Sequence, residues 1–136
     1  MTPAVGGDTP AIQVLRKSSV ADGFKIEFTA PTSVVEWGNL TIRLSEGTNE
    51  TLWTSIPTED LTSPTPPAIW IGGEQNLGGL RVFLNVTDLA ANGRMSNGDY
   101  IILTTAIDHF SPLKTYSLIL IFEPTSGQML NYSFTG

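Results

Sequence analysis

Apolar and polar residues alternate along several short segments of the chain. In one of them, Phe24, Ile26 and Phe28 alternate with Lys25 and Glu27, which is the period-2 pattern of a half-buried β-strand. Similar alternation, or a run rich in β-branched and aromatic residues, predicts further strands along the whole chain. The predicted strands cover residues 11–17, 23–30, 39–45, 51–56, 68–71, 80–86, 100–105, 114–124 and 127–134.

The segments between these strands contain residues that turn or interrupt a chain. Proline is frequent in residues 56–67, and paired glycines begin and end residues 72–79, so both segments are predicted to be loops. No amphipathic helix of about ten or more residues is predicted. One-sided strands must bury their apolar faces against a second sheet. The pattern therefore predicts an all-β fold, an antiparallel β-sandwich of immunoglobulin-like architecture with about nine strands.

A chain of 136 residues is long enough for one domain with its own hydrophobic core. We expect residues 11–136 to form this domain, and residues 1–10, which hold two prolines and two glycines, to be a flexible linker. The longest apolar run, residues 118–122, is far shorter than a membrane span, and the first residues lack the features of a secretory signal. A helix that exports or anchors the protein is therefore expected to be absent from this chain.

The charge of the chain limits the partners that it can bind. Thirteen acidic residues against seven basic ones give a net charge of -6, which argues against nucleic acid and anionic membrane surfaces as partners. Cations are the better-matched small ligands. The absence of cysteine excludes disulfides and thiolate metal sites, and it leaves the redox compartment open.

One polar loop has the spacing of a calcium site. Asp88, Asn92, Gly93 and Asp99 occupy positions 1, 5, 6 and 12 of a twelve-residue calcium loop, with Gly93 as the turn glycine. Arg94 at position 7 would offer its backbone carbonyl. An alanine stands at position 3, and Asp99 is shorter than the usual glutamate. We therefore expect calcium to bind weakly if at all, and no cofactor to be required. The alternative is a hairpin connection whose Asn-Gly steps supply turn residues and whose aspartates are solvated.

Catalytic chemistry has little support in the sequence. His109 is the only histidine and lies beside Asp108 and near Ser111, but neighbouring residues on a strand or turn point apart, and no nucleophile-elbow sequence is present. Glu59 and Asp60 are adjacent on a loop, without a visible partner across a cleft. We predict that the protein is not an enzyme.

Four of the seven asparagines fit the N-x-Ser/Thr rule for N-linked glycosylation. The predicted acceptors are Asn39, Asn49, Asn85 and Asn131. The strand alternation places Asn39, Asn85 and Asn131 on outward faces, where a glycan fits. The alternative is that a threonine-rich β protein contains such triplets by chance.

The two most apolar strands do not alternate as the others do. If one face of the last apolar strand fills the core, Ile119 and Ile121 point to the other side and form an apolar patch beside Ile102. Either the loop of residues 56–67 covers this patch, or a neighbouring subunit docks on it.

Three features together resemble the extracellular domain of archaeal type IV pilin-like proteins. They are the Trp37-Gly38 step before a strand, the segment VTDLAANGRMSNGDYIIL and the segment TYSLILIFEPTSGQML. The resemblance implies a β-rich head that follows a cleavable signal and a hydrophobic helix. It also implies a cation site at Asp88, Asn92 and Asp99.

We therefore expect a non-enzymatic, extracellular head domain of a pilin-like or cell-envelope protein, located at the cell surface. Its role would be filament assembly or surface adhesion, with other subunits of that kind as partners and with membrane contact only through an N-terminal helix. The alternative is a β-sandwich module that binds a ligand such as carbohydrate through an exposed Trp53 or Trp70. A hydrophobic helix encoded directly upstream would favour the head domain, whereas an attached catalytic domain would favour the binding module.

Overall fold

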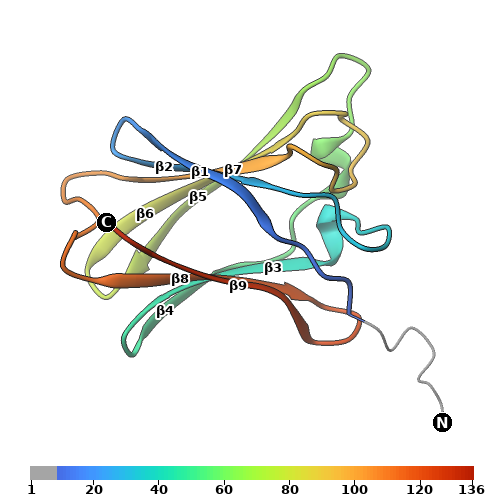
Figure 1. Ribbon diagram of the computed structural model, residues 1–136. Helices are drawn as coiled ribbons and strands as arrows, with labels where there is room; N and C mark the ends of the chain where they lie inside the picture. The colour runs from blue at the N-terminus through green and yellow to red at the C-terminus, as the bar shows by residue number, and fades with distance from the viewer. Residues whose placement is uncertain (1–8) are drawn as a thin grey trace, which may run out of the picture.

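Two antiparallel β-sheets face each other across the hydrophobic core (Figure 1). The computed structural model describes residues 9–136. The strands are β1 (Val14–Val20), β2 (Gly23–Phe28), β3 (Leu40–Glu46), β4 (Asn49–Trp53), β5 (Ala68–Leu77), β6 (Leu80–Asp88), β7 (Tyr100–Thr105), β8 (Thr115–Phe122) and β9 (Gly127–Thr135). One sheet has the strand order β1-β2-β7-β6-β5, and the other has the order β4-β3-β8-β9.

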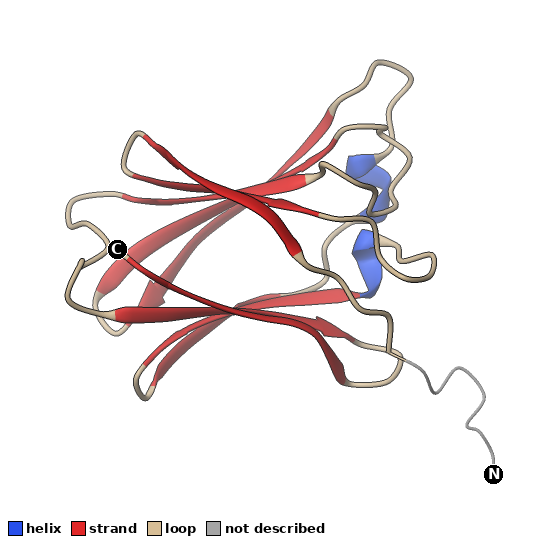
Figure 2. Cartoon of the chain, viewed as in Figure 1, coloured by secondary structure: helices blue, strands red, loops and turns tan. Residues whose placement is uncertain are grey.

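Two short 3₁₀ helices lie at one end of the sandwich (Figure 2). They are η1 (Trp37–Asn39), between β2 and β3, and η2 (Thr58–Leu61), between β4 and β5. Both lie in connections that carry the chain from one sheet to the other. Within residues 9–136, no helix has the length and apolar character needed to cross a bilayer.

The strand order is that of an immunoglobulin-like sandwich. Such domains place strands A, B, E and D in one sheet and strands C, F and G in the other. Here β1, β2, β7 and β6 take the A, B, E and D places, while β3, β8 and β9 take the C, F and G places. β4 extends the second sheet beside β3, and β5 extends the first sheet beside β6. The predicted immunoglobulin-like β-sandwich is confirmed.

A second feature of this architecture lies at the start of β8. The hydroxyl of Tyr116 accepts a hydrogen bond of 2.8 Å from the backbone N–H of Ser111. A tyrosine near the start of strand F that bonds backwards along the chain is the tyrosine corner of immunoglobulin-like domains. Leu118, two residues later, is fully buried at the place where antibody domains carry a disulfide cysteine. Apolar packing therefore replaces the inter-sheet disulfide in this protein.

Alternation along the strands fills the core as the sequence predicts. Ile26 and Phe28 on β2 are fully buried, as are Leu118 and Leu120 on β8. Burial of each side chain of this size contributes roughly 1.5 to 3 kcal/mol of hydrophobic stabilisation. The core between the two sheets is therefore the main source of stability of the fold.

The expectation of a loop over residues 72–79 is wrong. β5 continues to Leu77 and pairs with β6, and only Gly78 and Gly79 form the turn of the hairpin. An extra residue, Gly72, creates a β-bulge that shifts the register of the pairing. Glycine is tolerated in a strand at a bulge, so the glycine pair does not end the strand.

Bulges are a common property of the strands at the sheet edges. The extra residue is Leu15 in β1, Gly72 in β5 and Met129 in β9. The fourth edge strand, β4, has five residues. Each bulge bends its strand and leaves one residue unpaired.

The predicted linker, residues 1–10, falls mostly outside the described residues. Of its last two residues, Pro10 is buried, and Oγ1 of Thr9 lies 2.5 Å from Oγ1 of Thr125 in the β8–β9 turn. Residues 9 and 10 therefore pack onto the sandwich, and residues 1–8 are not described.

Candidate functional site

The polar loop of residues 89–99 joins β6 to β7 at the end of the sandwich that carries η1 and η2 (Figure 2). Its centre, Gly93, accepts a hydrogen bond of 3.0 Å from the N–H of Trp37 and donates one of 2.9 Å to the carbonyl of Leu61. Further bridges join Glu36 to Arg94 and Thr62 to Asn92. The loop thus lies like a short strand between the two segments that contain η1 and η2. We call residues 35–38, 58–63 and 89–99 together the interlocked loops.

Gly93 is the residue that permits this close approach. Its backbone φ angle is 77°, and a β-carbon at this position would lie 2.6 Å from Cγ2 of Thr58. Only glycine combines a left-handed backbone with the absence of a side chain. The glycine that the calcium-loop pattern places at position 6 is therefore required by the packing of the loops.

Asp88 and Asp99, at the two ends of this loop, are both fully buried. Oδ1 of Asp99 accepts the N–H of Leu89 at 2.9 Å, and its Oδ2 accepts the N–H of Ser96 at 2.9 Å. Oδ1 of Asp88 accepts the N–H of Ala91 at 3.0 Å. These carboxylates thus bind backbone N–H groups of the loop, and the N–H of Ala91 also donates to the carbonyl of Asp88 at 3.2 Å.

Burial changes the proton affinity of both carboxyls. Desolvation raises the pKa of Asp99 to about 6, the N–H groups of Leu89 and Ser96 oppose this shift, and the neighbouring charge of Asp88 adds to it. Desolvation also raises the pKa of Asp88, against the backbone N–H groups of residues 90–93. Oδ2 of Asp88 is buried without a hydrogen-bond partner. Ionisation of this pair is therefore less favourable than ionisation of two solvated aspartates.

The structure brings together only part of the predicted calcium set. Asp88 and Asp99 are buried at the base of the loop, but Asn92 and Arg94 are exposed, and Oδ1 of Asn92 accepts the N–H of Arg94 at 3.0 Å. In the part of the chain that the structure describes, no three acidic, histidine or cysteine side chains are grouped to hold a metal ion. The expectation that the two aspartates are solvated is wrong, because both bind the loop backbone. Weak calcium binding stays a prediction.

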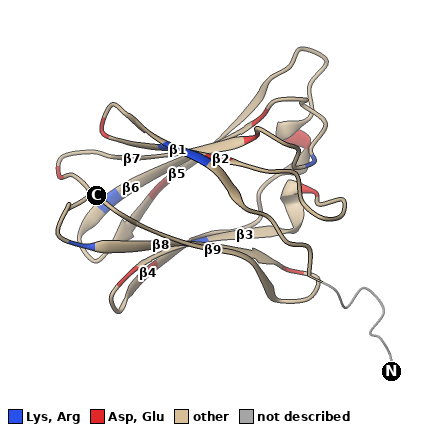
Figure 3. Cartoon of the chain, in the orientation of Figure 1, with Lys and Arg blue, Asp and Glu red and all other residues tan. Residues whose placement is uncertain are grey.

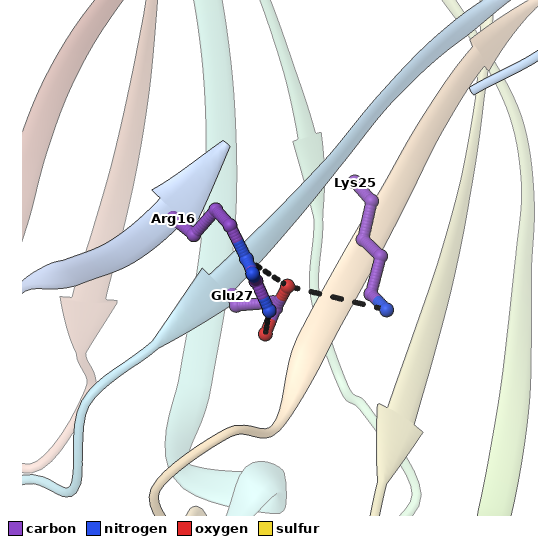
Figure 4. Close-up of polar contacts among 3 residues, drawn as sticks. All are labelled: Arg16, Lys25 and Glu27. Atoms are coloured by element: carbon purple, nitrogen blue, oxygen red, sulfur yellow. Dashed lines mark hydrogen bonds and ion pairs between the residues drawn. The ribbon is translucent and has the colours of Figure 1, made fainter. Parts of the chain in front are cut away.

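Charged residues on the strands are paired locally. Glu27 is buried on the outer face of β2, where Arg16 donates two hydrogen bonds to it, of 3.0 and 3.2 Å, and Nζ of Lys25 lies 4.0 Å away (Figure 4). The bonds from Arg16 lower the pKa of Glu27 despite its burial. The strands carry five basic residues (Figure 3), and the pairs that they form are Arg16–Glu27, Lys17–Phe24, Lys25–Glu27, Arg43–Glu50 and Arg81–Glu74. Four of these five basic side chains thus have a carboxylate partner, whereas Lys17 lies over the rings of Phe24 and Phe134.

The polar residues considered for catalysis lie at the surface. His109 is exposed, and its Nδ1 is 3.9 Å from Oδ1 of Asp22 in the β1–β2 turn. Glu59 and Asp60 are exposed on η2. These side chains lie at opposite ends of the sandwich, so they do not converge on a common site.

The two tryptophans proposed for carbohydrate binding are held by the core. Trp53 is buried, and its Nε1 donates a hydrogen bond of 3.2 Å to the carbonyl of Gly73. Trp70 is half-buried and packs against the core. The expectation of an exposed ring at Trp53 is wrong, because the alternation of β4 turns this side chain inward.

The four predicted glycosylation sites lie at different places on the outer surface. Asn39, Asn49 and Asn131 are exposed, at the end of η1, the start of β4 and the middle of β9. Asn85 is half-buried in the middle of β6. Glycosylation of these residues stays a prediction.

The three isoleucines of the predicted interface do not share a surface. Ile102 lies on β7 in the five-stranded sheet, whereas Ile119 and Ile121 lie on β8 in the four-stranded sheet. Ile119 does point away from the core, but it is only 4% exposed between its cross-strand neighbours Arg43 and Asn131. The expected joint patch is therefore absent, because its members belong to opposite faces of the sandwich.

An apolar feature that was not predicted from the sequence lies at the other end of the molecule. The loop of residues 106–114, between β7 and β8, lies opposite the end where residue 9 enters the fold (Figure 1). In this loop Ile107 is 78% exposed and Leu113 is 94% exposed. We call the loop with these two side chains the apolar tip. Two large apolar residues in a loop between predicted strands were the signal that would have identified it.

The apolar tip is held in place from within. Phe110, between the two exposed residues, is buried, and its ring centre lies 5.7 Å from that of Phe24 and 5.0 Å from that of Tyr116. Ser111 is bonded to Tyr116 at the tyrosine corner, and its Oγ accepts the N–H of Leu113 at 3.1 Å. A recess of about 500 Å³ lies beside the loop, between Lys114 and the β5–β6 turn. The loop thus presents apolar groups from a fixed backbone.

Comparisons of the chain with models of protein families, with curated proteins and with solved structures gave no match.

Proposed function

We propose that this chain is the non-enzymatic head domain of an extracellular, pilin-like or cell-envelope protein, and that it acts in filament assembly or surface adhesion. The observation that carries the proposal is the apolar tip, with Ile107 and Leu113 exposed on an anchored loop. A segment that precedes residue 9 would attach at the opposite end of the sandwich (Figure 1). The tip would then face away from the point of attachment.

The anchoring of the tip supports a role in binding. Exposed apolar residues on a mobile loop lose conformational freedom when they bind, and this loss weakens the complex. Here the buried ring of Phe110 and the hydrogen bonds of Ser111 fix the loop before any partner arrives. Burial of two branched aliphatic side chains against a partner contributes roughly 1.5 to 3 kcal/mol each.

The test is a double variant, Ile107→Ser with Leu113→Ser, expressed as the sole copy of the full-length parent protein in its native host. We expect cell adhesion or the number of surface filaments to fall by about tenfold or more, since central apolar contacts of an interface are each worth over about 1.4 kcal/mol. The purified domain should keep its melting temperature, because exposed substitutions change the stability by less than about 0.5 kcal/mol.

Val34→Ser is the matched control, because Val34 is 71% exposed and lies in the β2–β3 connection at the other end of the sandwich. Loss of filaments in the double variant would assign the tip to contacts between subunits. Loss of adhesion with normal filaments would assign it to contacts with a target surface. Normal filaments and normal adhesion in the double variant would contradict the proposed function.

A further inference from the structure

The outer face of the five-stranded sheet has an asparagine at the centre of an apolar area. Asn85 on β6 pairs with Ile71 of β5 on one side and with Ile102 of β7 on the other. Ile71 is 73% exposed, and Ile102 is half-buried. Cross-strand neighbours lie within side-chain contact of one another. Any group attached to the Asn85 side chain would therefore lie over both isoleucines.

The residues along β6 add an aromatic ring to this face. Because side chains alternate along a strand, Phe83, Asn85 and Thr87 all point outward. The other three acceptor asparagines lack this arrangement. The residue two positions before Asn39 is Trp37, and the one before Asn131 is Met129; both are buried in the core. The residue two positions before Asn49 is Gly47, which has no side chain.

We propose that Asn85 carries an N-linked glycan whose first sugar packs on the ring of Phe83 and covers Ile71 and Ile102. The inference rests on the extracellular location in the proposed function, because this modification requires export. A sugar ring has one face of C–H groups, which packs on aromatic and aliphatic surface in the same way as other apolar groups. The glycan would thus remove the apolar surface of Ile71 and Ile102 from water, which is favourable.

The modification is a group transfer from a lipid phosphate-linked oligosaccharide, catalysed by a membrane oligosaccharyltransferase. The amide nitrogen of Asn85 loses one proton and forms a bond to the anomeric carbon of the first sugar. The bond from that carbon to the phosphate oxygen breaks, and the lipid phosphate leaves with the bonding electrons. The acceptor rule also requires recognition of the hydroxyl at Thr87.

The burial of Thr87 sets the order of events. Thr87 pairs with Ile69 of β5 and Tyr100 of β7, and it is buried. A transferase cannot reach a buried hydroxyl in the middle of a sheet, so transfer to Asn85 precedes the docking of β6 between its neighbours. The glycan is then present when the sheet forms and can stabilise it.

Mass spectrometry tests the occupancy of the site. Trypsin releases the segment between Arg81 and Arg94, which contains only the Asn85 acceptor sequence. We expect this peptide from native-host protein to carry a glycan and to lose it in the Asn85→Gln variant. An unmodified peptide overturns the inference. If the Asn85 peptide is unmodified but Asn39, Asn49 or Asn131 carries a glycan in the same sample, the extracellular location is still correct.

Stability tests the packing on Phe83. Asn85→Gln should lower the melting temperature of the glycoprotein by about 3 to 5 °C, whereas Asn131→Gln, the matched control on the other sheet, should change it by less than about 1 °C. Both variants should melt like the parent when all are made in a host without N-glycosylation.

A double-mutant cycle separates packing from a purely structural role of the ring. Phe83→Leu should lower the melting temperature of the glycosylated parent more than that of the Asn85→Gln variant. Only in the glycosylated parent does this substitution remove a contact between the ring and the sugar. Equal effects of Phe83→Leu in the two backgrounds would overturn the packing of the glycan on Phe83.

Discussion

The buried carboxyl of Asp99 should make the free energy of unfolding depend on pH. Its pKa is about 6 in the folded protein and 3.8 in the unfolded chain, so the folded state binds a proton more tightly. The stabilisation from this proton is fully present below about pH 4 and is lost as the pH rises through about 6. Glu27, with a lowered pKa, acts in the opposite direction but only at lower pH, as its carboxylate becomes protonated. We therefore expect the free energy of unfolding to fall between about pH 4.5 and pH 6.

Urea unfolding at a series of pH values measures this dependence. A shift of this size corresponds to on the order of 3 kcal/mol. Asp99→Asn cannot ionise and should reduce the slope to the part that comes from the raised pKa of Asp88, although it loses the bond from Ser96 to Oδ2 and is less stable overall. Asp108→Asn, in an exposed loop, should keep the slope of the parent. An unchanged slope in Asp99→Asn would assign the pH dependence to other groups.

At the scale of the elements, the packing of the interlocked loops should depend on the absence of a side chain at Gly93. Gly93→Ala must adopt a left-handed backbone and also place a methyl group 2.6 Å from Thr58. The backbone costs about 1 to 2 kcal/mol, and the steric overlap adds about 1 to 3 kcal/mol. We expect a clear fall in the free energy of unfolding, measured by chemical denaturation.

Gly73 offers a matched control for this substitution. Its φ angle is 84°, but a β-carbon there would meet no atom within 4 Å. Gly73→Ala should therefore cost only the backbone term of about 1 to 2 kcal/mol. If the two variants lose the same stability, the loops can move apart and Gly93 is not required for their packing.

Some of the strands and loops could be predicted from the sequence, and others could not. Alternation identifies β2, because one face of this strand fills the core, whereas a continuous apolar run identifies β8, in which Leu118, Ile119 and Leu120 are all buried. It fails in the second half of β5, because glycine pairs are typical of loops and only the pairing with β6 shows that Gly72 is a bulge. The Asn-Gly steps predict a connection between two strands at residues 89–99, and the structure has a loop there. Spacing alone cannot distinguish a carboxylate that binds a cation from one that binds backbone N–H groups.

Long-range arrangement accounts for the other errors. Ile102 and Ile119 have similar apolar surroundings in the sequence, but strand order places them on opposite faces of the molecule. The tyrosine corner was recognisable in principle, because Tyr116 precedes the buried Leu118 by two residues at the start of an apolar strand. In the apolar tip the sequence shows large apolar residues between two predicted strands, but only the three-dimensional structure shows that Phe110 is buried and Leu113 is not.

For the whole molecule we predict one cooperative unfolding transition. Both sheets share a single core, and a domain of this size normally unfolds without a populated intermediate. Tryptophan fluorescence, which reports on buried Trp37 and Trp53, and far-ultraviolet circular dichroism should give the same midpoint. Refolding should take milliseconds to seconds, as is typical of sandwiches with distant strand pairings. Two separate transitions would show that residues 11–136 are not one folding unit.

The bulged and short strands at the sheet edges have a consequence for how copies of this domain can associate. An open, regular edge strand offers free N–H and C=O groups to another chain, and it is a route to aggregation and to strand exchange between molecules. In β1, β5 and β9 the bulges at Leu15, Gly72 and Met129 interrupt that row of groups, and β4 is too short to offer a long one. A polymer of such domains would therefore grow through side-chain contacts of faces, loops or a preceding segment, and its subunits would separate without breaking a shared sheet.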